Sequence, residues 1–274
     1  METLRQDVTY ALRRLIKAPL FTVVAVLTLG LGIGANAAIF SVVHGVLLKP
    51  LPYPESDRLV GIYHVSEGTH RTVMSGPNFM DVMHAASTLE NAAAISRERL
   101  VLTGAGDPLR LTAAGVSASL FNVLRVQPAL GRGFNADEDT PGKDHVIVLS
   151  HALWQQRFGA DPAVIGREIQ VDGVSREIVG VMPADFSYPA GIEAWIPLTY
   201  DANFVSKQRG AWYLNTVARL KAGVTPQQSA AEVEAIGRNL ARQYPGDDGS
   251  IGMTTYPLLD AMVGNIRTSI LVLL

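Results

Sequence analysis

The most hydrophobic stretch of the chain lies near its start. No Asp, Glu, Lys or Arg occurs between Ala18 and Leu48, a run of 31 residues. Within it, Leu20–Val42 has 23 residues, twelve of them Leu, Ile, Val or Phe, and as a helix would be about 34 Å long. A hydrocarbon core is roughly 30 Å thick, so the pattern predicts a transmembrane helix over residues 20–48.

The flanks of this stretch predict its orientation. Four basic residues precede it within residues 5–17, whereas Lys49 and Arg58 are the only cations that follow it closely. The positive-inside rule therefore predicts a cytoplasmic N-terminus and an extracytoplasmic body. Residues 1–19 also carry apolar positions at helical spacing, which predict a cytoplasmic amphipathic helix on the inner membrane surface: Leu4, Val8, Leu12 and Leu15 or Ile16.

Two other interpretations of the hydrophobic stretch remain open. Ala35-Asn36-Ala37 resembles a signal-peptide cleavage site, but apolar residues continue to Leu48. Residues 32–37 also satisfy G-x-G-x-x-A, although no strand precedes them and the prolines that follow prevent a crossover helix. We therefore favour an uncleaved membrane anchor.

Small residues recur along one face of the predicted membrane helix. Gly30, Gly34 and Ala38 are spaced four apart, which permits close packing against another membrane helix. We name these three as candidate helix-packing residues.

Beyond the anchor, the pattern of hydrophobic residues predicts two similar β-α-β units, at about 58–96 and 210–257. The first reads as the strand "LVGIYHV", the helix "SGPNFMDVMHAASTLE" and a strand in "NAAAIS". The second reads as the strand "AWYLNTVARL", a helix and the strand "IGMTTYPL". Thr225, Pro226 and Gln228 give the second helix a capping box. The fold class predicted is α+β, a split sandwich with an insert.

Between the two units, the sequence pattern of residues 97–209 predicts an inserted, mainly β subdomain. Ile169 and Val171 alternate inward before Asp172-Gly173, a pair that favours a type I′ turn. We therefore predict a structural hairpin at Asp172 and Gly173. "HVIVLSHALWQQRFG" predicts a further strand followed by a helix.

Composition excludes several kinds of chemistry. The chain has no cysteine, so disulfides and thiolate chemistry are excluded, and its net charge of −2 does not favour nucleic acid. There is no Walker A loop, and the six histidines lack metal-binding spacing, so most are expected at the surface or at helix caps. The acidic run Asp137-Glu138-Asp139 lacks the glycine and glutamate of an EF-hand and is interpreted as a solvated turn. We expect no catalytic residues, metal or cofactor.

The last residues are hydrophobic again. "SILVLL" begins at Ser269 and stops at Leu274, too short to cross a bilayer. We interpret residues 258–274 as the start of a second membrane helix, truncated here.

Three long blocks resemble one protein family. They are "DVTYALRRLIKAPLFTVVAVLTLGLGIGANAAIFSVVHGVLLKPLPYP", then "VIVLSHALWQQRFGADPAVIGREIQVDGVSREIVGVMPADFSYP" with "AWIPL", and "ARLKAGVTPQQSAAEVEAIGRNLARQYP". They are similar to the MacB/FtsX family of ABC-transporter permeases, in the group with a MacB-like periplasmic core domain, which would here occupy residues 49–257.

The resemblance implies a permease subunit in the bacterial inner membrane. Such permeases place a large extracytoplasmic domain between their first two membrane helices, and a separate ABC ATPase drives its motion. A homodimer or pseudo-dimer and a periplasmic adaptor are further implied partners. The alternative function is a single-span anchored binding or adaptor module without transport, and a third is an enzyme secreted by cleavage after Ala37.

Overall fold

The structure is a computed structural model that describes residues 6, 10, 13–43, 49–66, 70–104, 106–199, 209–249 and 252–264. The chain divides into two units, residues 1–50 with 263–274, and residues 51–262, each treated by itself below. Three apolar positions of the predicted amphipathic helix (Leu4, Val8 and Leu12), residues 44–48 and residues 265–274 lie outside the described part.

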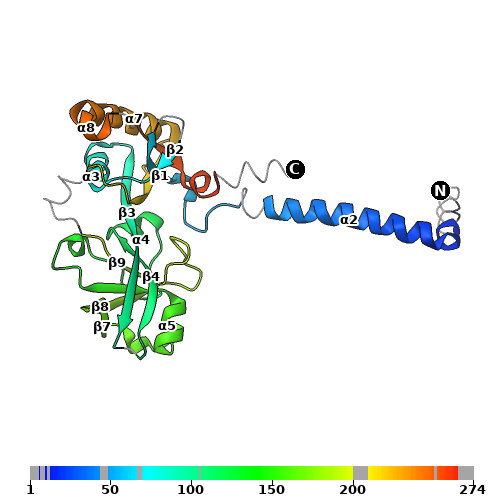
Figure 1. Cartoon of the computed structure of the whole chain (residues 1–274), viewed down its shortest axis with the longest axis horizontal. Coiled ribbons are helices and arrows are strands. Elements are labelled where there is room, and N and C mark those ends of the chain that lie inside the picture. The colour runs from blue at the N-terminus through cyan, green and yellow to red at the C-terminus, as the bar shows by residue number, and fades with distance from the viewer. Residues whose placement is uncertain are drawn as a thin grey trace. The chain divides into compact units, whose positions relative to one another are not determined.

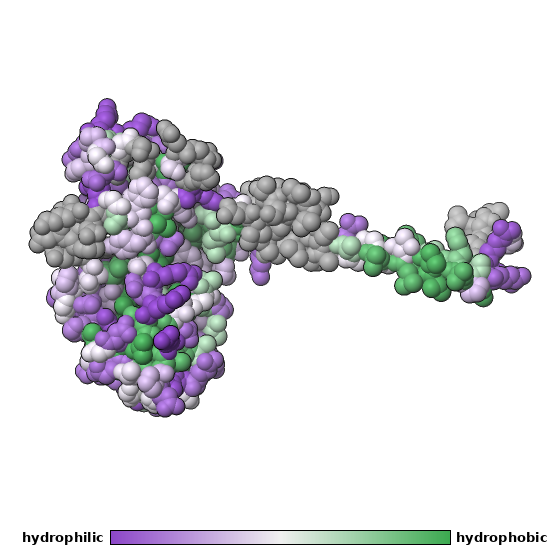
Figure 2. Space-filling view, viewed as in Figure 1, coloured by the Kyte–Doolittle hydropathy of each residue, from purple (hydrophilic) through white to green (hydrophobic). Residues whose placement is uncertain are grey.

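The first unit contains one long helix, α2 (Pro19–Val43). Residues 19–37 are long and apolar enough to cross a membrane, and none of this stretch is buried against the rest of the chain. Figure 2 shows its surface as almost uniformly hydrophobic, whereas residues 51–262 present a mixed surface. A helix that is apolar all round is stable in lipid, because every backbone group from its interior is bonded within the helix.

The second unit contains an 11-stranded sheet (Figure 1). Its main path runs β11-β1-β10-β3-β4-β9-β6-β8-β5, with β2 on β1 and β7 on β3 and β8. The strands are β1 (Leu59–Ser66), β2 (His70–Thr72), β3 (Leu89–Thr103), β4 (Leu109–Val116), β5 (Leu130–Gly131), β6 (Val146–Leu149), β7 (Glu168–Val171), β8 (Val174–Val181), β9 (Ala194–Pro197), β10 (Asn215–Leu220) and β11 (Gly252–Pro257). The helices are α3 (Gly76–Ala85), α4 (Leu120–Leu124), α5 (His151–Phe158), α7 (Pro226–Gln243) and α8 (Pro245–Asp248), with short 3₁₀ turns η2 (Ser56–Arg58), η3 (Ala136–Asp139) and η4 (Pro162–Val164).

The two predicted β-α-β units interlock in this sheet. β10, from the second unit, lies between β1 and β3 of the first and pairs with both in antiparallel fashion. The resulting order, β11-β1-β10-β3, is the split β-α-β arrangement. The α+β class, with one apolar helix before it, is therefore confirmed.

Helices α3 and α7 cover one face of these four strands. Their apolar side chains form one core with Val60 and Ile62 of β1 and Met253 of β11. Gly237 of α7 permits a close approach, since a Cβ there would lie 3.0 Å from the backbone nitrogen of Met253. The capping box predicted at Thr225 and Gln228 is present at the start of α7.

The strand predicted in residues 91–96 is longer than its apolar residues indicated. β3 runs for 15 residues, pairing first with β10 and then, from Ile95 to Leu102, with β4. Its second half alternates exposed and partly buried positions, so the apolar run alone missed it. Position 96/97, where we had divided the first unit from the insert, therefore falls inside one continuous strand.

Glu232 joins α7 to the turn before β3. Its carboxylate accepts hydrogen bonds from the backbone N–H groups of Ser87 and Thr88, at 2.8 and 2.9 Å, and from both hydroxyls. Partial burial raises the pKa of Glu232, but these hydrogen bonds outweigh it and bring the pKa to about 2. A carboxylate with several backbone donors behaves in this way because the donors favour its charged form.

We expect Glu232 to stabilise the fold in a pH-dependent way. Its pKa is lower in the folded state than the ordinary value of 4.5, so its contribution is full above pH 4.5 and is lost as pH falls towards about 2. In Glu232→Gln, urea unfolding should show a deficit in free energy that is largest near pH 6 and shrinks below pH 4.5. Asp185→Asn, at an exposed position, controls for the loss of one charge. A deficit that stays constant from pH 6 to pH 2.5 would contradict this assignment.

Candidate functional site

The segment that follows the apolar helix is fixed to the body of the second unit. Leu51 and Tyr53 pack against a core that includes Phe186 and Tyr188. The ring centroid of Tyr53 lies 6.5 Å from that of Phe186 and 6.1 Å from that of Tyr188, both edge-on. Pro52 and Pro54 restrict the backbone between these contacts, so little of the exit segment, residues 51–58, is free to flex.

One buried side chain holds this exit segment. Arg219 of β10 is only 1% exposed, and its guanidinium donates to three backbone carbonyls. Nε donates to Val123 of α4 at 2.8 Å, and the two terminal nitrogens donate to Glu55 and Pro54 at 3.1 Å each. Arg219 therefore joins the exit segment, the central strand and α4. The planar fork of an arginine suits such a contact, because its donors point in several fixed directions.

Four charged residues surround this contact. Glu55 and Glu90 each form ion pairs with both Arg58 and Arg125. Hydrogen bonds from Arg58 and then Arg125 lower the pKa of Glu55, so it stays ionised. Burial lowers the pKa of Arg219, as do the like charges of Arg125 and Arg58, while Glu55 and Glu90 raise it. The two carboxylates thus offset part of the cost of burying a charge. We call Arg219 with these four residues the exit clamp.

The chain leaves the sheet beside the point where it enters. β1 begins at Leu59, and its Val60 pairs with Pro257, the last residue of β11. Leu258, the next residue, is 2% exposed and belongs to the same core as Leu59. A domain whose two ends are adjacent can be inserted between two neighbouring segments without distortion.

The predicted helix-packing residues lie on α2. Gly30 and Gly34 are exposed, and a Cβ built on either would meet no atom within 4 Å. Ala38 lies on the same helix, but the surroundings of its side chain are outside the described residues. The role of these three residues therefore stays a prediction.

Asp172 and Gly173 form the two-residue connection between β7 and β8. Both have positive φ, 52° and 76°, as a type I′ turn requires. Asp172 has a second contact that the turn motif did not indicate: its carboxylate accepts from the backbone N–H of Val101 at 2.7 Å. Its own N–H donates to the Val101 carbonyl at 3.0 Å. The hairpin is thus held to the far part of β3.

One histidine differs from the expectation that most lie at the surface or in caps. His64 of β1 is fully buried, and its Nε2 lies 3.1 Å from the side-chain nitrogen of Asn78. Burial lowers the pKa of His64 to about 4, so the ring is neutral near pH 7. Its Nδ1 has no hydrogen-bond partner among the described residues, although the ring stacks edge-on against Trp212. Within the described ranges, no group of three or more His, Asp or Glu side chains gathers to hold a metal.

The sequence matches a known protein family. The family model described as the MacB-like periplasmic core domain matches residues 22–236, from inside α2 to inside α7. The chain belongs to the MacB-like periplasmic core domain family. No curated protein matches the sequence.

Solved structures share the fold of this periplasmic core domain. A permease-protein domain from Porphyromonas gingivalis aligns with a TM-score of 0.57 at 15% identity, over 75% of this chain and 92% of that one. The periplasmic region of MacB from Actinobacillus actinomycetemcomitans gives 0.54 at 12%, over 84% and 98%. The extracellular domain of the noncanonic ABC-type transporter YknZ, from Gram-positive bacteria, gives 0.52 at 12%, over 72% and 99%.

The exit clamp was not found from the sequence. A signal was present, because Arg219 stands inside the apolar strand "NTVARL", where an unpaired charge is costly. Its acceptors, however, lie 96 and more than 160 positions away along the chain. Only the fold brings them together.

We expect loss of Arg219 to weaken the fold substantially. Arg219→Met leaves three carbonyls without a donor, which should lower the free energy of unfolding by about 3 kcal/mol. Arg219→Lys keeps the charge but cannot reach three acceptors, so it should recover only part of the loss. Guanidinium unfolding of the full chain in detergent, followed by tryptophan fluorescence to which the buried Trp195 contributes, measures both. Arg99→Met, at an exposed position on β3, is the control, and an equal effect of Arg219→Met and Arg99→Met would refute the assignment.

Proposed function

We propose that this chain is the first membrane span and extracytoplasmic domain of an ABC-type permease subunit. The exit clamp is the single observation that carries the proposal. It fixes residues 54 and 55, which follow the predicted span in the sequence, to the domain through Arg219, so a force on this exit segment would act on the sheet. The adjacent ends of β1 and β11 support the same account, because they suit a domain inserted between two membrane helices.

In this proposal a separate ABC ATPase supplies the energy. Residues 1–19 would lie on the cytoplasmic surface of a bacterial inner membrane, residues 20–48 would cross it, and residues 49–257 would form the extracytoplasmic domain. A second span, predicted over residues 258–274, would begin after Met262, because Leu258 belongs to the core of the domain and residues 51–262 form one unit. ATP-driven movement of the spans would then do work outside the membrane, in export or another envelope process.

The membrane helix would pack against a second one through Gly30, Gly34 and Ala38. Small residues at this spacing let two backbones approach closely in lipid. The neighbouring helix would come from the same subunit or from the other half of a homodimer or pseudo-dimer. A periplasmic adaptor is a further proposed partner.

The proposed orientation can be tested directly because the chain contains no cysteine. In spheroplasts, a membrane-impermeant maleimide should label Lys143→Cys but not Gln6→Cys, and both should react once the cells are lysed. Both positions are exposed in the structure. Labelling of Gln6→Cys in intact spheroplasts would contradict a cytoplasmic N-terminus.

The proposed ATPase partner can be tested by purification. The tagged chain, extracted from membranes of its native host in mild detergent, should carry with it a subunit that hydrolyses ATP. The same purification with an unrelated single-span protein is the control. Repeated recovery without any nucleotide-binding subunit would favour the single-span binding module instead.

A further inference from the structure

Strand β11 forms an open edge of the sheet. It pairs with β1 from Val60 to Val65, and no other described strand lies on its far side. Natural edge strands are usually blocked by charged side chains, proline or a bulge. β11 reads "GMTTYP", which has no charge and only a terminal proline. Among the described residues none of these devices blocks β11, although its Met253, Thr254 and Thr255 are only 1%, 8% and 5% exposed.

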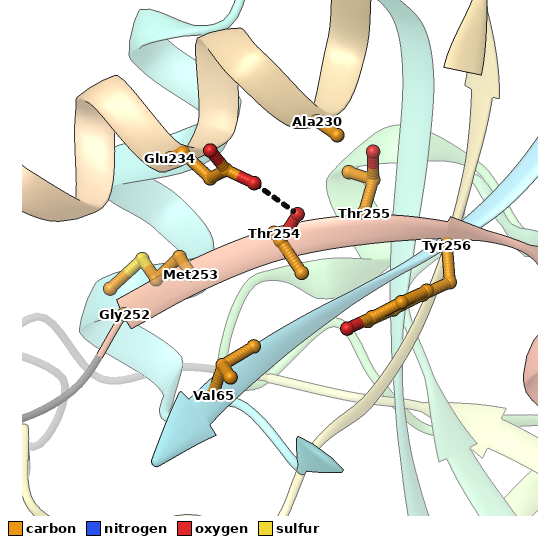
Figure 3. Close-up of a pocket in the computed structure, with 8 residues that line it drawn as sticks. All are labelled: Val65, Ala230, Glu234, Gly252, Met253, Thr254, Thr255 and Tyr256. Carbon is orange, nitrogen blue, oxygen red and sulfur yellow. Dashed lines mark hydrogen bonds between the residues drawn. The ribbon is translucent and has the colours of Figure 1, made fainter. Parts of the chain in front are cut away.

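A hollow of about 460 Å³ runs along this edge (Figure 3). Five consecutive residues of β11, Gly252–Tyr256, line it. Ala230 and Glu234 of α7 border it on one side of the strand, and the side chains of Val65 and Tyr256 lie on the other. Because its walls belong to both faces of the sheet, the hollow lies at the edge itself, where the next strand would be placed.

The side towards α7 carries a negative charge. The exposed Glu234 carboxylate accepts a hydrogen bond from the Thr254 hydroxyl at 3.1 Å and forms no ion pair with the described part of the chain. A basic side chain on an added strand would complement it.

On the face of the sheet opposite α7, a positive charge lies over two tyrosine rings, one of which, Tyr256, lines the hollow. Val60 and Ile62 point towards α7, so Tyr63 and Val65 point to the other face. On that face the Arg71 guanidinium lies 5.7 Å from the ring centroid of Tyr63 and 5.0 Å from that of Tyr256. The guanidinium of Arg71 forms no hydrogen bond or ion pair with the described residues beyond these ring contacts. Arginine and tyrosine are the residues most often found at the energetic centre of an interface.

We propose that β11 binds an extended segment of a partner protein, which adds to the sheet as a new strand. Alternate side chains of a strand point to opposite faces, so one set would meet Glu234 and the other would meet Arg71. The bound segment would therefore carry basic residues at one parity and acidic residues at the other. A second copy of β11 does not fit this pattern, since it has no charged residue to offer either side. The inference is independent of the proposed transport function.

A designed peptide tests this site on the full chain in detergent. The probe is fluorescent Lys-Val-Thr-Glu-Lys-Val-Thr-Glu, which presents Lys and Thr on one face and Val and Glu on the other. We expect saturable binding by fluorescence anisotropy. Arg71→Glu should weaken it at least tenfold, and a probe with Lys in place of both Glu residues should recover binding to that variant. Arg99→Glu, at an exposed position of β3, should leave binding unchanged.

N-methylation of the probe separates strand addition from attraction of charges. Two methylated probes are made, one with methyl groups on the odd-numbered backbone nitrogens and one with them on the even-numbered nitrogens. Only one of these two sets of N–H groups donates hydrogen bonds to β11, so methylation should abolish the binding of one probe and leave that of the other unchanged. Three results would each overturn the proposal. They are equal effects of the two methylation patterns on binding, no saturable binding at 1 mM probe, and binding of the probe to the Arg71→Glu variant as tight as to the unaltered chain. The proposal would also be wrong if the probe does not bind and the chain instead forms a dimer that β11 substitutions abolish. The edge would then bind a second copy of the chain.

Discussion

The buried guanidinium of Arg219 is the interaction on which the arrangement of the second unit depends. A charge with 1% exposure is costly unless it is well paired. Here three carbonyls from two separate segments accept its hydrogen bonds, and the two carboxylates nearby offset part of the repulsion from Arg58 and Arg125. The exit segment, β10 and α4 are therefore held in one geometry. Displacing any of them would leave a buried charge or a buried acceptor unpaired.

The position of Arg219 in the split sheet determines where a force on the exit segment would act. β10 lies between β1 and β3, so a force on Arg219 acts on the middle of the sheet rather than on its edge. β3 then continues for 15 residues into the strands of the insert, where Asp172 holds the β7–β8 hairpin to it. In the proposed function, the path from the exit segment to the hairpin runs through hydrogen-bonded strands, which are stiff along their length.

Local signals in the sequence were enough to place many elements of this fold. Thr225 and Gln228 marked the start of α7, and Asp172 with Gly173 marked the β7–β8 turn, because caps and tight turns depend on neighbouring residues. The extent of β3 was underestimated, since its second half is held by pairing with β4 rather than by its own apolar residues.

The contacts that matter most for function could not be read in this way. Arg219, its carbonyl acceptors and the acids around it come from parts of the chain far apart in sequence. The burial of His64 was likewise not predicted, because its contacts with Asn78 of α3 and with Trp212 are made only by the fold. Sequence periodicity identifies which residues face inward, but it does not pair them across the fold.

Distance measurement between two spin labels tests the central claim, that the exit segment and the domain move as one body. Labels at Asp57→Cys, within the exit segment, and Lys143→Cys can be introduced cleanly, because the chain has no cysteine of its own and both positions are exposed. Pulsed electron paramagnetic resonance should give a single narrow distance distribution in the otherwise unaltered chain, and a broad one after Arg219→Met. A broad distribution before that substitution, or the same narrow one after it, would contradict the account.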